Sequence, residues 1–179
     1  MWRHQGLTDR HSMHETLQAF VKWLENTPWG VAVRGSSWMY PIIEWVHFSG
    51  LSVGLGSSVV VDLRLMGEGR RRMSAAQLSD SLFAWNWIGF CVAFLGGFLL
   101  FSADATTYVS NTGFCVKLGV LTPLALIWHV VVQKKTPAWT HAEEKSAIGK
   151  WAGLVEFLLW ISVISASVYF LLTNAVTHP

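Results

Sequence analysis

The chain has 179 residues, of which 52% are apolar and 13% charged, with a mean hydropathy of +0.38 and 11 tryptophans. This composition is too apolar for an ordinary soluble domain, and a net charge of +2 is too small to indicate nucleic-acid binding. The length indicates one domain, residues 1–179, which we expect to be an all-α membrane protein.

The first predicted element is an amphipathic helix over residues 12–26. Ser12 and Glu15 fit a capping box, and apolar residues follow at helical spacing as far as Leu24. The segment is too polar to cross a bilayer, so we expect it to lie along the membrane surface or to pack on a partner subunit. The sequence Asn26-Thr27-Pro28 predicts its end.

Four longer apolar runs follow, each close to the ~20 residues that cross a bilayer as a helix. They cover residues 38–61, 82–103, 114–132 and 151–172. We therefore predict an integral membrane four-helix bundle with the lipid bilayer as its main contact. Capping boxes at Ser74-Ala75-Ala76-Gln77 and Thr140-His141-Ala142-Glu143 predict that the second and fourth helices begin before their apolar runs, and Gly67 is expected to end the first helix.

Lysine and arginine in the short loops predict the orientation. The loop after the second span, residues 102–113, carries neither, whereas the loops after the first and third spans carry four each. These residues are Arg64, Arg70, Arg71, Arg72, Lys134, Lys135, Lys145 and Lys150. Both basic loops are predicted to be cytoplasmic, so we expect a multi-pass protein of a bacterial inner membrane with both termini in the periplasm.

The first span contains the strongest indication of a functional site. Between residues 38 and 61 its only acidic, basic or imidazole side chains are Glu44 and His47, which share one helical face, and Asp62 returns to that face eighteen positions after Glu44. Ionisable groups at membrane depth are costly and usually functional. Small residues follow His47 at positions 50, 54, 56, 57 and 58, and they allow either a close helix partner or a flat macrocycle. His47 is therefore a candidate ligand of a metal or a tetrapyrrole, with Glu44 as a further metal ligand, or else a hydrogen-bonded structural histidine.

The third and fourth spans supply the second set of candidates. His129 and Glu156 are expected at similar depths on antiparallel spans, where they can pair by a plain hydrogen bond or as a carboxylate that orients an imidazole ligand. His129 is thus the next candidate for a cofactor or metal. Counted along the helices, His47 and His129 differ in depth by ~13 Å, so we expect them to serve separate sites.

Three further residues have open roles. Lys117, near the outer end of the third span, is either the counter-ion of Glu44 or a side chain that reaches to the outer interface. Arg64, beside Asp62 at the cytoplasmic end of the first span, can bind a lipid or propionate carboxylate or anchor the helix. Asn86 lies within the second span and needs a hydrogen-bond partner.

Three motifs carry a resemblance to a known family. They are Tyr40-Pro41-Ile42-Ile43-Glu44-Trp45-Val46-His47, Asp62-Leu63-Arg64-Leu65-Met66-Gly67 and Phe114-Cys115-Val116-Lys117-Leu118. Over about residues 38–133 the chain resembles an uncharacterised family of small four-helix bacterial inner-membrane proteins, which implies the membrane class and the choice of residues. More loosely, a histidine in the first span with a lysine and a histidine in the third resembles four-helix b-type cytochromes and the membrane domain of copper-resistance proteins.

These observations give three hypotheses. The first is an integral membrane b-type haem protein, a redox or electron-transfer component with His47 as the axial ligand and His129 next. The second is a protein that handles or transports copper, with Glu44, His47 and Lys117 at an outer site and His129 with Glu156 at an inner one. The third is an accessory subunit of a larger respiratory or photosynthetic membrane complex. We expect either a homo-oligomer or membership of such a complex.

Overall fold

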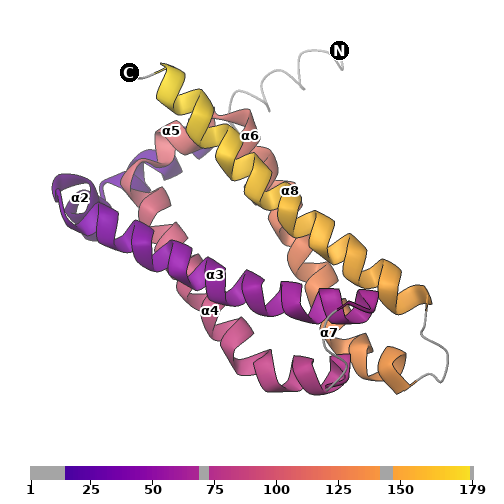
Figure 1. The fold of residues 1–179 in the computed structure, drawn as a ribbon. Coiled ribbons are helices and arrows are strands. Elements are labelled where there is room, and N and C mark those ends of the chain that lie inside the picture. Colours follow the sequence, from indigo (N-terminus) through magenta and orange to yellow (C-terminus); the bar gives the residue numbers. More distant parts are fainter. Residues whose placement is uncertain (1–14, 69–72, 142–146, 178–179) are drawn as a thin grey trace, which may run out of the picture.

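The computed structural model describes residues 15–68, 73–141 and 147–177. Over these ranges the regular structure is helical throughout, and the long helices form a bundle (Figure 1). The bundle consists of α3 (Met39–Met66), α4 (Ala75–Ala103), a continuous run of α6 (Thr112–Val116), η1 (Lys117–Leu121) and α7 (Thr122–His141), and α8 (Ala147–Thr177). The predicted all-α bundle is confirmed.

Four helical stretches within the described ranges are long and apolar enough to cross a membrane. They are Met39–Met66, Ala75–Ala103, Thr112–Trp139 and Ala147–Thr173. The chain is therefore a multi-pass membrane protein, and each helix continues beyond the apolar run that predicted it.

The predicted helix ends between the first two spans are confirmed. The Ser74 hydroxyl accepts from the Gln77 N–H at 3.1 Å, and the Gln77 side chain accepts from the Ser74 N–H at 2.9 Å, which completes a capping box. Gly67 ends α3 with a φ of 96°, a conformation that glycine adopts without strain. The second predicted box, Thr140 to Glu143, extends outside the described residues.

The predicted N-terminal helix is present over residues 15–25, whereas its capping residue Ser12 lies outside the described ranges. One edge of the helix is buried, because Val21 and Leu24 pack on Ala105. Its other large apolar side chains are exposed, namely Leu17, Phe20 and Trp23. This arrangement fits a helix that is tethered to the bundle and keeps an apolar face for the membrane interface.

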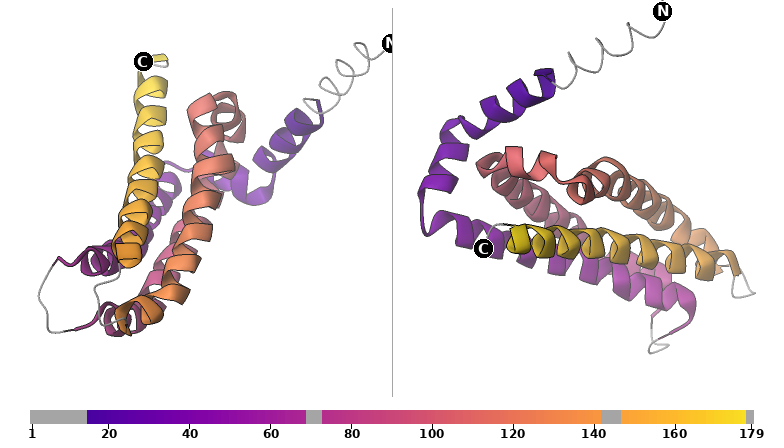
Figure 2. Two further views of the ribbon diagram at one scale, coloured as in Figure 1. Left: turned by 90° about the vertical axis from the view of Figure 1, so that its right-hand side faces the viewer. Right: turned by 90° about the horizontal axis from the view of Figure 1, so that it is seen from above.

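A short helix that the sequence did not predict follows directly. It is α2 (Pro28–Gly35), in which Thr27 is the capping residue and Pro28 occupies the first turn. We took Pro28 only as the end of the preceding helix, but proline is equally favoured at the first position of a new one. Figures 1 and 2 place α2 at the end of the bundle opposite the end of α3 and the start of α4.

The third span changes its helical repeat within its first third. Over η1 the backbone is π-helical, and the N–H of Thr122 donates to the carbonyl of Lys117, five residues earlier. Pro123 follows and has no N–H to donate, which is a local reason for the altered register. The wider turn begins at Lys117, one of the predicted site residues.

The closest contact in the bundle joins α3 to α4 through glycines. A Cβ atom added at Gly89 would lie 2.4 Å from the Gly54 nitrogen, and one at Gly50 would lie 2.7 Å from the Ala93 nitrogen. Of the two alternatives for the small residues after His47, the structure therefore supports close helix packing at Gly50 and Gly54 and leaves no room there for a flat macrocycle.

The other pair of long helices, α7 and α8, meets α3 mainly at one end of the bundle. A Cβ atom at Gly153 on α8 would lie 3.0 Å from the Asp62 carbonyl oxygen on α3. From this end, where α3 finishes and α8 begins, the two helices diverge toward the C-terminus (Figure 1). Between the two ends lies an apolar cluster of buried residues: Phe90, Ala125, Trp160 and Val163.

Candidate functional site

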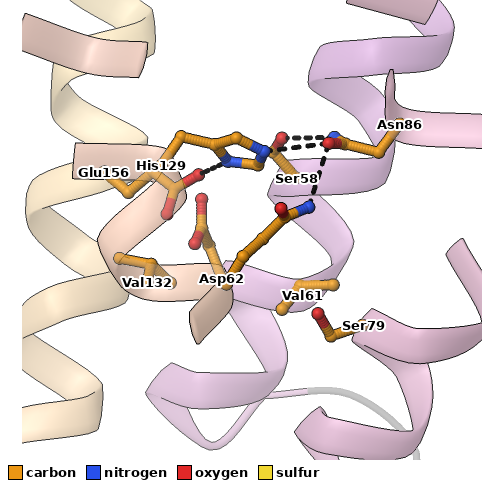
Figure 3. A pocket seen from close by; sticks show the side chains of 9 residues that line it. Ser58, Val61, Asp62, Ser79, Asn86, His129, Val132 and Glu156 are labelled. Carbon is orange, nitrogen blue, oxygen red and sulfur yellow. Dashed lines mark hydrogen bonds and ion pairs between the residues drawn. The ribbon is translucent and has the colours of Figure 1, made fainter. Parts of the chain in front are cut away.

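A small polar cavity lies inside the bundle where the four helices converge (Figure 3). Its volume is about 10 Å³, which is large enough for about one water molecule. Seven of its nine lining residues have polar side chains, and the full set is Ser58, Val61, Asp62, Ser79, Asn86, His129, Val132, Gln133 and Glu156. We call this the inner cluster. It unites four residues that the sequence had singled out, namely Asp62, Asn86, His129 and Glu156.

The predicted pairing of His129 with Glu156 is confirmed. The His129 Nδ1 atom lies 2.5 Å from Glu156 Oε1, and the two side chains are only 3% and 2% exposed. The indole N–H of Trp160 donates to the same carboxylate oxygen at 3.4 Å. A bond between α7 and α8 therefore forms in a region without competing solvent, where hydrogen bonds are electrostatically strongest.

Asn86 connects this pair to α3. Its Nδ2 group donates to the Gly54 carbonyl at 2.8 Å and to the Ser58 hydroxyl at 2.9 Å. Since a carbonyl can only accept, the amide orientation is fixed and Asn86 Oδ1 must face the other way, toward His129 Nε2 at 2.8 Å and the Gln133 amide at 3.1 Å. His129 Nε2 therefore carries a hydrogen and donates it to Asn86.

These contacts bear on the predicted ligand role of His129. Ligation of a metal requires an imidazole nitrogen with a free lone pair. Nε2 is protonated toward Asn86, and Nδ1 is occupied by Glu156. In this arrangement His129 is a hydrogen-bonding residue, and Glu156 orients it without a metal on the opposite nitrogen.

Asp62 is the unusual member of the inner cluster. It is 1% exposed, and neither of its carboxylate oxygens has a hydrogen-bond partner among the described residues. Oε2 of Glu156 is equally unpaired, although the two carboxyl groups lie side by side (Figure 3). Two ionised carboxylates cannot hydrogen-bond each other, because neither has a hydrogen to donate. An unpaired buried charge costs several kcal/mol, so this pair requires an explanation.

Arg64 is not the missing counter-ion of Asp62. The Arg64 Nε group donates to the Met73 carbonyl at 2.7 Å, which ties the end of α3 to the start of α4. Among the described residues, no lysine or arginine forms an ion pair with Asp62. Arg64 thus anchors a helix end, as one of its two predicted roles required.

The outer site is built around His47, which the structure holds by one nitrogen. His47 Nδ1 lies 2.6 Å from the Ala93 carbonyl oxygen on α4. The carbonyl can only accept, so Nδ1 carries the hydrogen and Nε2 keeps its lone pair. Gly96 and Gly97 permit this approach, because a Cβ atom on either would lie 3.0 Å from an atom of His47.

Glu44 and Lys117 lie near His47, but they do not pair with each other. Both charges are close enough to act on the imidazole electrostatically. The expected ion pair between Glu44 and Lys117 is absent, and both residues belong to the described part of the chain. The Lys117 ammonium instead lies 5.5 Å from the centre of the Phe114 ring, which is a cation–π contact.

The sequence did not identify two tyrosines at this end. The hydroxyls of Tyr40 and Tyr108 lie 3.3 Å apart, and the Tyr108 ring stacks on Phe170 with centroids 4.8 Å apart. Burial, followed by the bond to Tyr40, raises the pKa of Tyr108, so its phenol stays neutral at physiological pH. Tyr40 was visible beside Pro41 in the first motif, but nothing in the sequence connected it to a residue 68 positions away.

The two sites are separate. His47 and Asp62 are fifteen residues apart on α3, which is ~22 Å along the helix axis, and the apolar cluster around Phe90 and Trp160 lies between the ends. Within the described residues, no group of three or more His, Cys, Asp or Glu side chains is arranged to hold a metal ion.

Comparisons with protein-family models, with curated proteins and with solved structures found no match. The resemblance to small inner-membrane proteins stays a prediction, and the functional proposals depend on the geometry of the two sites.

Proposed function

We propose that the chain is an integral membrane redox component that holds haem b through Nε2 of His47. The observation that supports this most directly is the hydrogen bond between His47 Nδ1 and the Ala93 carbonyl. An imidazole whose second nitrogen is tied to a backbone carbonyl is fixed in the tautomer and orientation that ligation requires. Neutral imidazole is a common axial ligand of haem iron.

The surroundings of His47 suit a cofactor with acidic groups. Lys117 forms no ion pair with a described carboxylate, so its ammonium is free to meet a haem propionate. This assigns to Lys117 the role that the sequence had offered to Arg64. Arg64 lies seventeen residues from His47, ~25 Å along α3, and its guanidinium is directed to Met73.

Copper at the same residue is the second candidate. Glu44 precedes His47 by one turn of α3 and acts on its imidazole electrostatically. A carboxylate and an imidazole on one helical face are a partial ligand set for a transition metal. Since His129 is occupied, either metal would take its remaining ligands from water or from another subunit, and we propose a homo-oligomer or a larger membrane complex for that reason.

The experiment is a visible absorption spectrum and a metal analysis of the full chain purified in detergent. The proposal predicts a Soret band and iron, with haem retained but the spectrum shifted in Glu44→Gln, because that carboxylate tunes the ligand without providing the bond. Copper without haem would replace the first candidate by the second. Neither metal in a folded, monodisperse protein would overturn both.

We also propose that both termini face the periplasm of a bacterial inner membrane. The end of α3, the start of α4, the end of α7 and the start of α8 all lie at one end of the bundle (Figure 1), and the described basic residues Arg64, Lys134, Lys135 and Lys150 belong to these segments. Labelling of single cysteines introduced at the C-terminus, in a variant without Cys91 and Cys115, tests this. A C-terminus that reacts only after the membrane is permeabilised would contradict it.

A further inference from the structure

The hydrogens of the inner cluster can be counted from its acceptors. The Gly54 carbonyl fixes the Asn86 amide, and Asn86 Oδ1 then requires a hydrogen on His129 Nε2. The short contact from His129 Nδ1 to Glu156 Oε1 needs one hydrogen more, whichever atom carries it. As an ion pair or as two neutral groups, His129 and Glu156 together have no net charge.

This count leaves Asp62 without a partner. The groups that face it are Glu156 from α8, the neutral pair's His129 from α7, and the uncharged Ser79 and Asn86 from α4. On its own helix, Arg64 is directed to the Met73 carbonyl. An ionised Asp62 would therefore be a solitary charge beside a second carboxylate in the interior of an apolar bundle.

One added hydrogen removes the unpaired charge and pairs two of the three oxygens. A protonated Asp62 can donate its O–H to Oε2 of Glu156, the other carboxylate oxygen that has no partner. Two of the three unpaired oxygens then pair with each other, and the remaining Asp62 oxygen belongs to a neutral carboxyl group instead of a charged one. The new bond extends a single chain of hydrogen bonds that runs from Asp62 through Glu156 and His129 to Asn86.

We propose that the inner cluster is a binding site for one exchangeable proton, carried by Asp62 and shared with Glu156. On release, the O–H bond of Asp62 breaks, its electron pair stays on the carboxylate, and the proton passes to water. A proton fits better than a metal ion, because the cavity holds about one water molecule. Although Asp62, His129 and Glu156 all line it, no group of three such side chains among the described residues is arranged to hold a metal ion.

The surroundings of the site indicate the side from which the proton comes. Asp62 lies five residues before Gly67, ~7 Å from the end of α3, and the cavity also reaches Ser79 in the second turn of α4. Toward the middle of the bundle, the stacked rings of Phe90 and Trp160, with centroids 5.1 Å apart, close the path beside His129. The site therefore exchanges protons with the side of the basic loops, independently of what binds at His47.

Infrared spectroscopy of the full chain in lipid nanodiscs tests the proposal, with and without isotopic labelling of the aspartate side-chain carboxyl. At neutral pH the protein should show the C=O stretch of a protonated carboxyl, and this band should shift on aspartate labelling. It should be lost in Asp62→Asn and unchanged in Asp80→Asn, which removes an exposed aspartate of α4 in the same way. In Glu156→Gln the band should remain but move, because Asp62 then donates to an amide oxygen.

Three results would overturn the proposal. One is the absence of a protonated carboxyl band at neutral pH in the folded protein. Another is a band whose frequency does not shift on aspartate labelling, which would place the proton on a glutamate. A third is an undiminished band in Asp62→Asn. If Asp62→Asn fails to fold, as judged by its helical circular dichroism, the test is the shift of the C=O band on aspartate labelling of the wild-type protein.

Discussion

The two histidines within the spans differ in how many of their nitrogens are satisfied. His129 is 3% exposed and has partners for both ring nitrogens, whereas His47 is half-buried and is held by one. Both lie at membrane depth, where an ionisable residue is expected to be functional. The comparison teaches that membrane depth alone treats the two histidines alike, whereas the count of hydrogen-bond partners leaves a nitrogen free for a ligand only on His47.

The two ends of the bundle also hold together differently. At the inner end, a hydrogen-bond network reaches from Ser58 on α3 through Asn86 and His129 to Glu156 on α8, so it spans all four helices. At the outer end, stacked aromatic rings predominate, with Tyr108, Phe114 and Phe170 in mutual contact. Removal of a central side chain should therefore cost more at the inner end.

Replacement of Asn86 by alanine tests this difference most severely. The change leaves His129 Nε2 and the Gln133 Nε2 group without a partner and removes the bonds that Asn86 donates to Ser58 and Gly54, at about 1–3 kcal/mol for each buried group that stays unpaired. We expect the free energy of unfolding to fall by ~3 kcal/mol or more, measured by thermal or denaturant unfolding in detergent. A loss as small as that of Tyr108→Phe would show that the network contributes little.

A methyl group at Gly89 should cause the second-largest loss of unfolding free energy, because both ends of the bundle depend on the contact between α3 and α4. The added Cβ atom would meet the Gly54 backbone at 2.4 Å, so the helices must separate. We expect Gly89→Ala to lower the unfolding free energy by ~1–3 kcal/mol. Gly56→Ala is the matched control, since a Cβ atom there meets nothing within 4 Å, and it should be neutral or stabilising. Equal effects in the two variants would contradict the close packing.

Loss of the outer tyrosine bond should have the smallest effect. Tyr108→Phe removes one hydroxyl contact of 3.3 Å to Tyr40 and leaves the ring stack intact. A single such bond contributes ~0.5–1.5 kcal/mol, so we expect a loss at the lower end of that range. The same unfolding assay measures it, and a loss above that of Asn86→Ala would reverse the comparison between the two ends.

Several features of the fold were predictable because they depend on nearby residues. The apolar runs, the capping box at Ser74 and the helix end at Gly67 are local patterns. The His129–Glu156 pair followed from depth along two antiparallel spans. By contrast, α2 was missed because a proline can end one helix or begin the next.

The features that escaped prediction depend on which helix faces which. Whether the glycines after His47 admit a macrocycle or a helix is decided by Gly89 on α4, and no pattern within α3 shows it. The role of Asn86 depends on three helices that meet only in the folded bundle. Of the two alternatives for Lys117, the ion pair with Glu44 is not formed. Depth gives the position of a residue along its helix but not the direction of its side chain.

The central claim is that His47, and not His129, carries the cofactor, and haem content in paired histidine variants tests it most directly. Haem per chain would be measured from the Soret band of purified wild type, His47→Ala and His129→Gln, each shown to be helical and monodisperse. We predict that haem is lost in His47→Ala, because the iron loses its bond to Nε2, and that it is retained in His129→Gln. Haem retained in His47→Ala and lost in His129→Gln would contradict the claim.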